Sequence, residues 1–263
     1  MIRGFALLYG ICLLVLTSTV AASQATGDQR QLFRTLNFGA DPDRLVAMAT
    51  LRNVPVTERA PFILSALIKI LDEHVQEFRD RQSGVRTVSD QAGRDHTDVL
   101  DSALALVSGY DDPATLSSLL PFVNHGNALQ MAIARYGEHG VHWVAGIADV
   151  GSGATVNDVS GALNVLTFML EGHPKPEYML STSSRDRIAD LCRQRIQEFQ
   201  LVDGNQQVIM LAALIGEPDL LAMIRLMATD RAAAERAGGG PNMVMPIQMT
   251  AREALQAATK TKR

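Results

Sequence analysis

Apolar residues recur at helical spacing along almost the whole chain, and no stretch shows sustained alternation of apolar and polar positions. One stripe, within residues 58–80, consists of Leu64, Leu67, Ile68, Leu71, Val75 and Phe78. A second stripe, within residues 94–108, consists of His96, Val99, Leu100, Ala103, Leu104 and Val107. A third stripe, within residues 183–200, consists of Ile188, Leu191, Cys192, Ile196 and Phe199. The pattern predicts a helix in each range and an all-α fold.

Short junctions that contain glycine separate the predicted helices. Gly172 and Gly216 each follow an apolar stretch, and a proline comes two residues later in both cases. Glycine accepts the left-handed conformation that ends many helices, and proline suits the first turn of the next one. So short a junction turns the second helix back against the first. Similar junctions contain Gly39, Gly109 and Gly137.

The five junction glycines are separated by 70, 28, 35 and 44 residues. Units of about 30–45 residues with two helices each are typical of helical repeat arrays. With paired short helices expected around 94–124 and 205–229, residues 40–230 resemble the HEAT/armadillo-like superfamily of α-solenoids. The resemblance implies an irregular array of helical hairpins that binds proteins more often than it catalyses reactions. A non-repeating helical bundle is the alternative.

The first 22 residues have the pattern of a signal peptide. Arg3 supplies a positive charge, Phe5 to Leu16 form an apolar run, and the small residues up to Ala22 suit a peptidase. An apolar run of about a dozen residues is shorter than the roughly 20 that a spanning helix needs. We therefore expect cleavage after Ala22, an extracytoplasmic location and no stable membrane span in the mature protein. An uncleaved membrane anchor is the alternative.

The mature chain is expected to contain a repeat domain over 23–230 and a flexible segment over 231–263. The flexible segment begins with the glycines at 238–240 and Pro241, and a short helix is possible over 248–258. The chain has 24 basic and 28 acidic residues and a net charge of -4, which argues against a nucleic-acid partner. Cys192 is the only cysteine beyond the leader, and its place in a helical stripe indicates a buried hydrophobe.

Three histidines form the main candidate for chemistry: His125, His139 and His142. His139 and His142 are three residues apart, a spacing that can bring two imidazoles to one metal ion on a helix. Gly140 lies between them, and the metalloprotease order His-Glu-x-x-His is missing. Polar residues at a helix junction are therefore the first interpretation, and a metal site is the alternative.

Other possible sites are better explained by local structure. The glycine-rich run at 151–155 lacks the lysine of a phosphate-binding loop and is expected to cap a helix over 157–171. Asp111 and Asp112 precede Pro113, which favours helix capping over paired-carboxylate catalysis. A cluster of methionines, which suits either soft copper or an adhesive surface, consists of Met243, Met245 and Met249. No cofactor is expected.

These observations predict an exported α-helical repeat protein that acts as a scaffold for a protein or peptide. The second helices of the expected pairs, near 113–123, 141–149 and 218–229, carry few charges and are the candidate binding surface. An extracytoplasmic metalloprotein or hydrolase that uses His125, His139 and His142 is the alternative. A structural component of the cell envelope is a third possibility.

Overall fold

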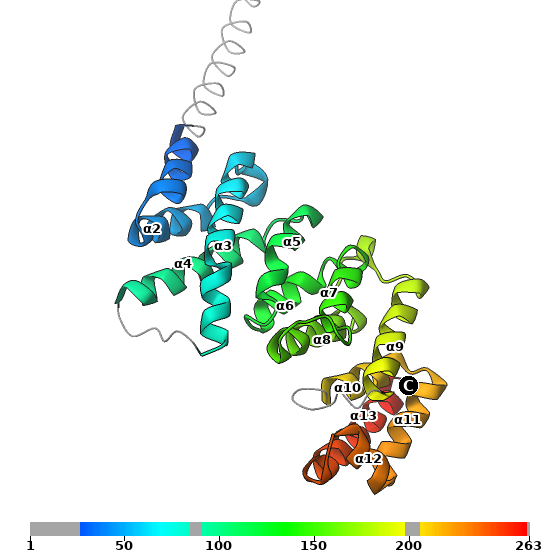
Figure 1. Ribbon diagram of the computed structural model, residues 1–263. Helices are drawn as coiled ribbons and strands as arrows, with labels where there is room; N and C mark the ends of the chain where they lie inside the picture. The colour runs from blue at the N-terminus through cyan, green and yellow to red at the C-terminus, as the bar shows by residue number, and fades with distance from the viewer. Residues whose placement is uncertain (1–26, 85–90, 198–205, 262–263) are drawn as a thin grey trace, which may run out of the picture. The chain divides into compact units, whose positions relative to one another are not determined.

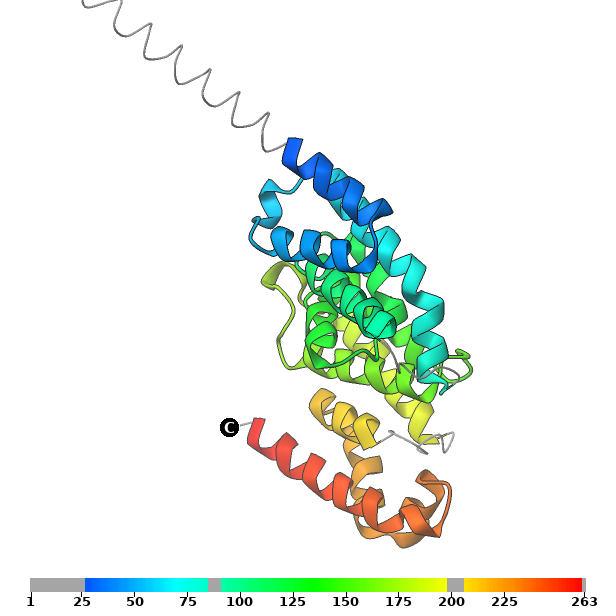
Figure 2. The ribbon, with the colours of Figure 1, turned by 90° about the vertical axis from the view of Figure 1, so that its left-hand side faces the viewer.

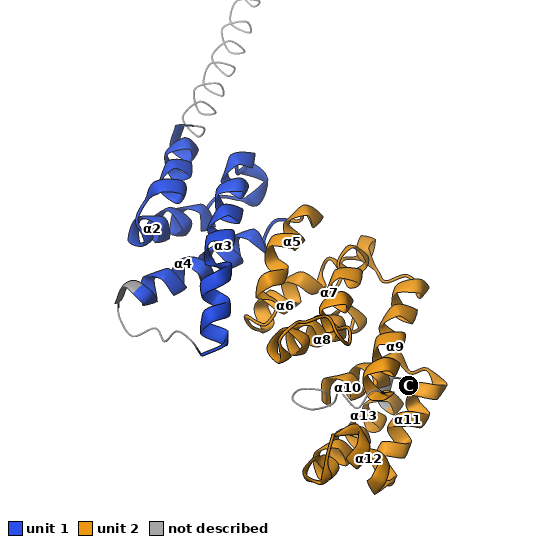
Figure 3. Cartoon of the chain, in the orientation of Figure 1, with its two compact units in different colours: residues 1–110 blue, residues 111–263 orange. Residues whose placement is uncertain are grey.

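The computed structural model describes residues 27–84, 91–197 and 206–261 (Figure 1). Within these ranges the chain forms helices and no strand, which confirms the predicted all-α class. The chain divides into two compact units, one ending at Tyr110 and the other beginning at Asp111 (Figure 3). The sequence instead predicts one repeat domain over 23–230. The signal peptide expected over 1–22 lies outside the described residues.

In its described residues, unit 1 contains four helices: one over 27–38, α2 (Asp41–Arg52), α3 (Pro61–Gln82) and α4 (Gln91–Val107). A short 3-10 turn, η1 (Val56–Glu58), lies between α2 and α3. Helix α4 packs against both α2 and α3. Prolines lie in the first turns of α2 and α3, where the missing backbone donor costs nothing. The predicted stripe of residues 94–108 is confirmed, because Val99, Leu100 and Ala103 are all buried.

The buried face of α3 is rotated relative to the predicted stripe. Ile63, Ile70 and His74 are buried, whereas Leu64 and Val75 remain partly exposed. The helix has apolar residues at several adjacent positions, so its own sequence allows more than one apolar face. Packing between helices selects the face, and that selection brings a histidine into the core.

Unit 2 consists of α5 (Leu116–Leu119), α6 (Asn127–Ala134), α7 (Val141–Ala148), α8 (Val156–Leu170), α9 (Thr182–Gln197), α10 (Gln206–Ile215), α11 (Pro218–Thr229), α12 (Arg231–Ala237) and α13 (Val244–Thr261). Five 3-10 turns interrupt them: η2 (Pro113–Thr115), η3 (Leu120–Phe122), η4 (Gly137–His139), η5 (Pro176–Tyr178) and η6 (Pro241–Met243). Most helices pack against near neighbours along the chain. Helix α8 packs against α6, α7 and α10, and α10 packs against α9 and α11.

The sequence predicts a flexible segment over 231–263 with a possible short helix, and the structure describes α12, η6 and α13 in this part of the chain up to residue 261. Helix α13 packs against α10 and α11, and both views show it beside α11 (Figures 1 and 2). Ile247, Ala251 and Ala254 have no exposed surface. Their three- and four-residue spacing forms an apolar stripe that the preceding glycines obscured. One of these, Gly238, has a structural role, because a Cβ there would lie 2.4 Å from the Cβ of Met243.

The junction glycines do not share one conformation. Gly172 and Gly216 have φ values of 91° and 76°, as the left-handed helix ends predict, and Gly216 directly follows α10. Gly137 also has a positive φ, of 42°. Gly39 and Gly109 are not among the positive-φ glycines. At Gly39 the constraint is space, since a Cβ would lie 2.5 Å from the carbonyl oxygen of Thr35.

Candidate functional site

Helix α7 presents the most distinctive exposed side chain of unit 2. The helix buries Val141, Val144 and Ala148, and on its other side Trp143 is 63% exposed. Gly146 follows one turn later, and a Cβ there would have no atom within 4 Å. A large aromatic ring left in water beside an open, uncharged helix surface is typical of an interaction site. This exposed side of α7, around Trp143, lies within a range that the sequence nominates for binding.

Two arginines of α9 fix the carboxyl end of α7. The guanidinium of Arg195, which is only 6% exposed, donates from Nε to the carbonyl oxygen of Ala148 and from Nη2 to that of Asp149, at 3.3 Å for the second bond. The last carbonyls of a helix have no partner within it and carry partial negative charge, so a buried cation is stabilising there. Burial lowers the pKa of Arg195, and the nearby Asp149 opposes that shift. Arg187 pairs with the Asp149 carboxylate.

The turn before α7 is attached to the first turn of α9. Glu138 accepts hydrogen bonds from the backbone nitrogen of Ser181 and from the hydroxyls of Ser181 and Ser184, each at 2.9 Å. The backbone N–H of Ser181 holds the pKa of Glu138 below its ordinary value. Ser181 also caps α9, because its hydroxyl accepts from the nitrogen of Ser184. Glu138, from a distant turn, thus adds acceptors for Ser181 and Ser184 beside this cap.

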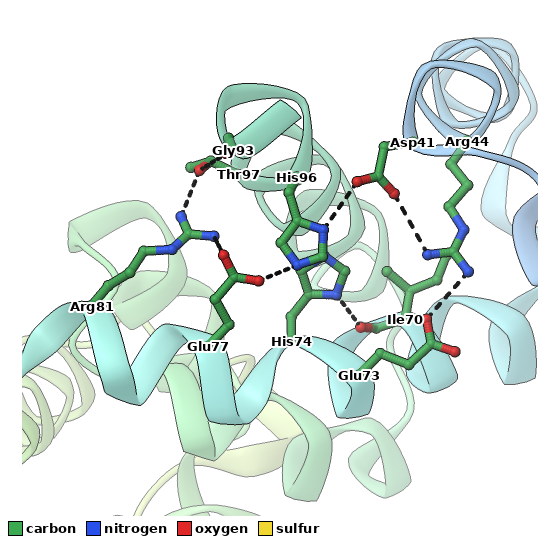
Figure 4. Close-up of polar contacts among 10 residues, drawn as sticks. All are labelled: Asp41, Arg44, Ile70, Glu73, His74, Glu77, Arg81, Gly93, His96 and Thr97. Carbon is green, nitrogen blue, oxygen red and sulfur yellow. Dashed lines mark hydrogen bonds and ion pairs between the residues drawn. The ribbon is translucent and has the colours of Figure 1, made fainter. Parts of the chain in front are cut away.

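Unit 1 contains a second unusual site, where α2, α3 and α4 meet around two histidines (Figure 4). His74 of α3 is 1% exposed, and its Nδ1 lies 2.6 Å from the carbonyl oxygen of Ile70. A carbonyl only accepts, so Nδ1 carries the proton of this hydrogen bond. The other nitrogen, Nε2, is buried without a hydrogen-bond partner. The ring of His96 stacks on that of His74 with centroids 3.9 Å apart.

His96 lies between two carboxylates. Its Nδ1 is 3.0 Å from Oδ2 of Asp41, and its Nε2 contacts Glu77. The two carboxylates can only accept hydrogen bonds. His96 can therefore donate to both of them only when each of its ring nitrogens carries a proton. Arg44 and Arg81 complete the network through Asp41 and Glu77 (Figure 4). We call this group the paired-histidine cluster; its members are Asp41, Arg44, Glu73, His74, Glu77, Arg81 and His96.

Within the paired-histidine cluster the two rings have different environments. Burial lowers the pKa of His74 below 6.5, and the neighbouring His96 acts in the same direction. The environment of His74 therefore favours its neutral ring. The sequence interpretation missed His74 because it chose the apolar Val75 for the stripe. The available signal was the position of His74 between Leu71 and Phe78, at helical spacing from both.

The histidines that the sequence nominates do not form a metal site. His139 contacts the ring of Tyr178 edge-on at 4.6 Å, and His142 lies beside Trp143 with centroids 6.5 Å apart. At His125 the backbone nitrogen donates to Phe122. Among the described residues, no group of three or more histidine, cysteine, aspartate or glutamate side chains is placed to hold a metal ion.

Three other predictions concern local structure and are confirmed. Cys192 is fully buried, and burial raises the pKa of its thiol to about 12, so the thiolate is not available at neutral pH. The glycine-rich run ends at Thr155, which caps α8 in a capping box with Asp158. Asp112 caps η2 by accepting from the nitrogen of Ala114 at 2.9 Å. These residues therefore have structural roles.

The methionine cluster is split by the structure. Met245 and Met249 are 71% and 52% exposed and lie one turn apart on α13, whereas Met243 belongs to η6 and is less exposed. This arrangement does not test whether the methionines bind copper or form an adhesive surface, and both interpretations stay predictions.

Comparison with protein-family models, with curated proteins and with solved structures gives no match in any of the three. None of the helices in the described ranges is both long and apolar enough to cross a membrane. A function for this protein therefore has to be argued from its own side chains. The two features that stand out are the exposed side of α7 and the paired-histidine cluster.

Proposed function

We propose that this chain is an exported α-helical repeat protein that binds another protein or a peptide through the exposed side of α7. The observation that carries the proposal is the 63% exposure of Trp143. Tryptophan is strongly enriched among the residues that dominate binding energy in interfaces. A monomer gains nothing from leaving so large an apolar ring in water, whereas a complex gains by covering it.

The attachment of α7 supports a binding role. Arg195 holds its carboxyl end, and Glu138 ties the preceding turn to α9. A side chain on a helix fixed at both ends loses little freedom when a partner covers it. Binding therefore costs less conformational entropy than it would on a mobile loop.

The pattern of helix contacts supports the repeat interpretation. In unit 2 the helices pack mostly against near neighbours, and Gly216 turns α11 back against α10. Such local packing is characteristic of helical arrays, in which each unit contacts only the next. Helix lengths differ widely, from the four residues of α5 to the 18 of α13, so the proposed array is irregular. The leader-like residues 1–22 support export.

Helix α7 itself contains no aspartate, glutamate, lysine or arginine, so we expect recognition by apolar burial and shape. His142 beside it is exposed, and Gly146 leaves room for a partner to approach the backbone. Electrostatic steering falls with ionic strength, whereas apolar burial changes little. The proposed complex should therefore persist when salt is raised.

The test is capture of partners from the extracytoplasmic fraction by the mature chain, followed by titration of the identified partner. Trp143→Ala should weaken the affinity at least tenfold, which corresponds to about 1.4 kcal/mol. Phe38→Ala is the matched control, because Phe38 is 81% exposed but belongs to unit 1. Trp143 is the single tryptophan, so its emission should shift to shorter wavelength as the partner covers it. A partner that binds Trp143→Ala with unchanged affinity would overturn the assignment of this surface.

A further inference from the structure

We propose that the stacked pair of His74 and His96 is a proton-sensitive lock, which holds α2, α3 and α4 together at neutral pH and loosens them in mild acid. The lock belongs to unit 1 and does not depend on the binding role proposed for α7. The geometry that carries it is the burial of His74, whose Nε2 has no hydrogen-bond partner among the described residues, against the stacked ring of His96 at 3.9 Å between centroids (Figure 4).

The environment of His74 fits only the neutral ring. Its Nδ1–H already donates to Ile70, and Nε2 is buried with no acceptor in hydrogen-bond reach. A proton on Nε2 would create a buried donor without a partner and a positive charge out of contact with water. Both changes are costly, because neither the hydrogen bond nor the hydration that water supplied is replaced.

His96 makes a proton on His74 still less favourable. Its ring lies directly across the stack, with centroids 3.9 Å apart, and it acts to lower the pKa of His74. Among the contacts that the structure describes, the carboxylates of Asp41 and Glu77 meet His96 and not His74.

Charged groups from all three helices face the stacked pair or its carboxylates. Helix α2 contributes Asp41 and Arg44, α3 contributes Lys69, Glu73, Glu77 and Arg81, and α4 contributes His96 itself. Asp41 and Glu77 attract a proton to His74, but burial has the larger effect, and the net direction is a lowered pKa.

The direction of the pH effect follows from linkage. Above pH 6.5, His74 is neutral in both the folded and the unfolded chain and contributes nothing to the pH dependence. As pH falls below 6.5, the unfolded chain binds a proton that the folded unit resists, so unit 1 loses stability. At pH 5.5 a fully resistant histidine would favour opening by about tenfold relative to pH 7.5.

The test is hydrogen exchange of the full chain, measured on peptides from α2, α3 and α4 at pH 7.5 and 5.5 and corrected for the intrinsic rate. The rise in the opening equilibrium between the two pH values should be about tenfold larger in the wild type than in His74→Asn. His74→Asn cannot titrate at this position, and its amide nitrogen can replace the donor to Ile70, so the comparison separates His74 from the titratable groups that both chains share. His142→Asn, an exposed histidine of unit 2, is the matched control and should keep the wild-type response.

Titration of the histidine rings by nuclear magnetic resonance in the wild type provides a measurement that does not depend on the folding of a variant. The ring of His74 should stay neutral as pH falls through the ordinary histidine value of 6.5. The lock is overturned if the wild type and His74→Asn open equally more at pH 5.5. It is equally overturned if His74 takes up its proton at or above pH 6.5.

Discussion

The contacts around the paired-histidine cluster in unit 1 differ in chemistry from those at the end of α7 and at Gly161 in unit 2. In unit 1, α2, α3 and α4 meet through side-chain charges, with His96 between Asp41 and Glu77. At the two places in unit 2, a side chain and a glycine meet the backbone: Arg195 donates to the carbonyls at the end of α7, and Gly161 lies against the carbonyl of Val123. The strength of a contact between titratable side chains depends on pH and salt. The strength of a close contact to the backbone depends mainly on how well the shapes fit.

Two buried basic side chains make this difference concrete. His74 is 1% exposed and Arg195 is 6% exposed, so both are removed from water. The guanidinium stays protonated at any physiological pH, and its donors reach carbonyl oxygens. The imidazole of His74 has a pKa that burial lowers below 6.5, and its Nε2 has no hydrogen-bond partner among the described residues. We therefore expect the contact of His74 in unit 1 to change with pH and the contact of Arg195 in unit 2 to stay the same.

Removal of Arg195 should give the largest effect. Arg195→Leu leaves the buried carbonyls of Ala148 and Asp149 without these donors, and we expect a loss of about 3 kcal/mol in the free energy of unfolding. Urea unfolding followed by Trp143 emission measures it, because Trp143 lies on the same helix. Arg187→Leu is the control and should cost less than about 1 kcal/mol, since its pair with Asp149 is a third exposed. Equal losses would contradict the backbone role.

Two glycines of unit 2 test how much close packing against the backbone contributes to stability. Gly161 and Gly146 both lie inside helices, but a Cβ at Gly161 would be 2.5 Å from the carbonyl oxygen of Val123, whereas Gly146 faces open space. Gly161→Ala should destabilise unit 2 by about 2 kcal/mol through overpacking. Gly146→Ala should stabilise it by about 0.5–1 kcal/mol, because alanine is the better helix former. Urea unfolding of both variants decides the matter, and a neutral Gly161→Ala would remove the argument for close packing.

The sequence predicts well those features that depend on a few neighbouring residues. The helix over 157–171 is observed as Val156–Leu170, and Gly216 takes the left-handed conformation that its place after α10 requires. The cap at Asp112 likewise follows from the residues beside it. In each case propensity, capping and conformation act within one or two turns, so a single sequence contains the whole cause.

Features that depend on distant contacts escaped the sequence interpretation. The burial of His74 follows from which face of α3 meets α4, and the acceptor that completes the cap of α9 comes from Glu138, 43 residues earlier than Ser181. Helix α13 was expected to be short because the glycines at 238–240 suggested a flexible chain. Its packing against α10 and α11 stabilises an order that local composition does not reveal.

The smallest expected change in stability concerns Glu138, whose contact in unit 2 should respond to a different pH range from that of His74 in unit 1. The carboxylate of Glu138 accepts from the first turn of α9, and its pKa lies below the ordinary 4.5. A lowered pKa in the folded state gives stability that is present above 4.5 and is lost as pH falls through the lowered value. Between pH 6.5 and 5, therefore, the His74 lock of unit 1 should respond while this contact of unit 2 does not.

Glu138→Gln keeps the shape of the side chain but removes its charge. We expect it to lower the stability of unit 2 by about 0.5 kcal/mol at pH 7, as for a weakened helix cap at an exposed site. Urea unfolding by Trp143 emission at pH 7, 5 and 3 should show the same loss of stability at the first two values and a smaller loss at the third, because the carboxylate becomes protonated only below 4.5. Glu177→Gln, at an exposed position of η5, is the control and should show no difference at any pH. If the Glu138→Gln difference instead disappeared between pH 7 and 5, both units would respond to mild acid, and the contrast between them would fail.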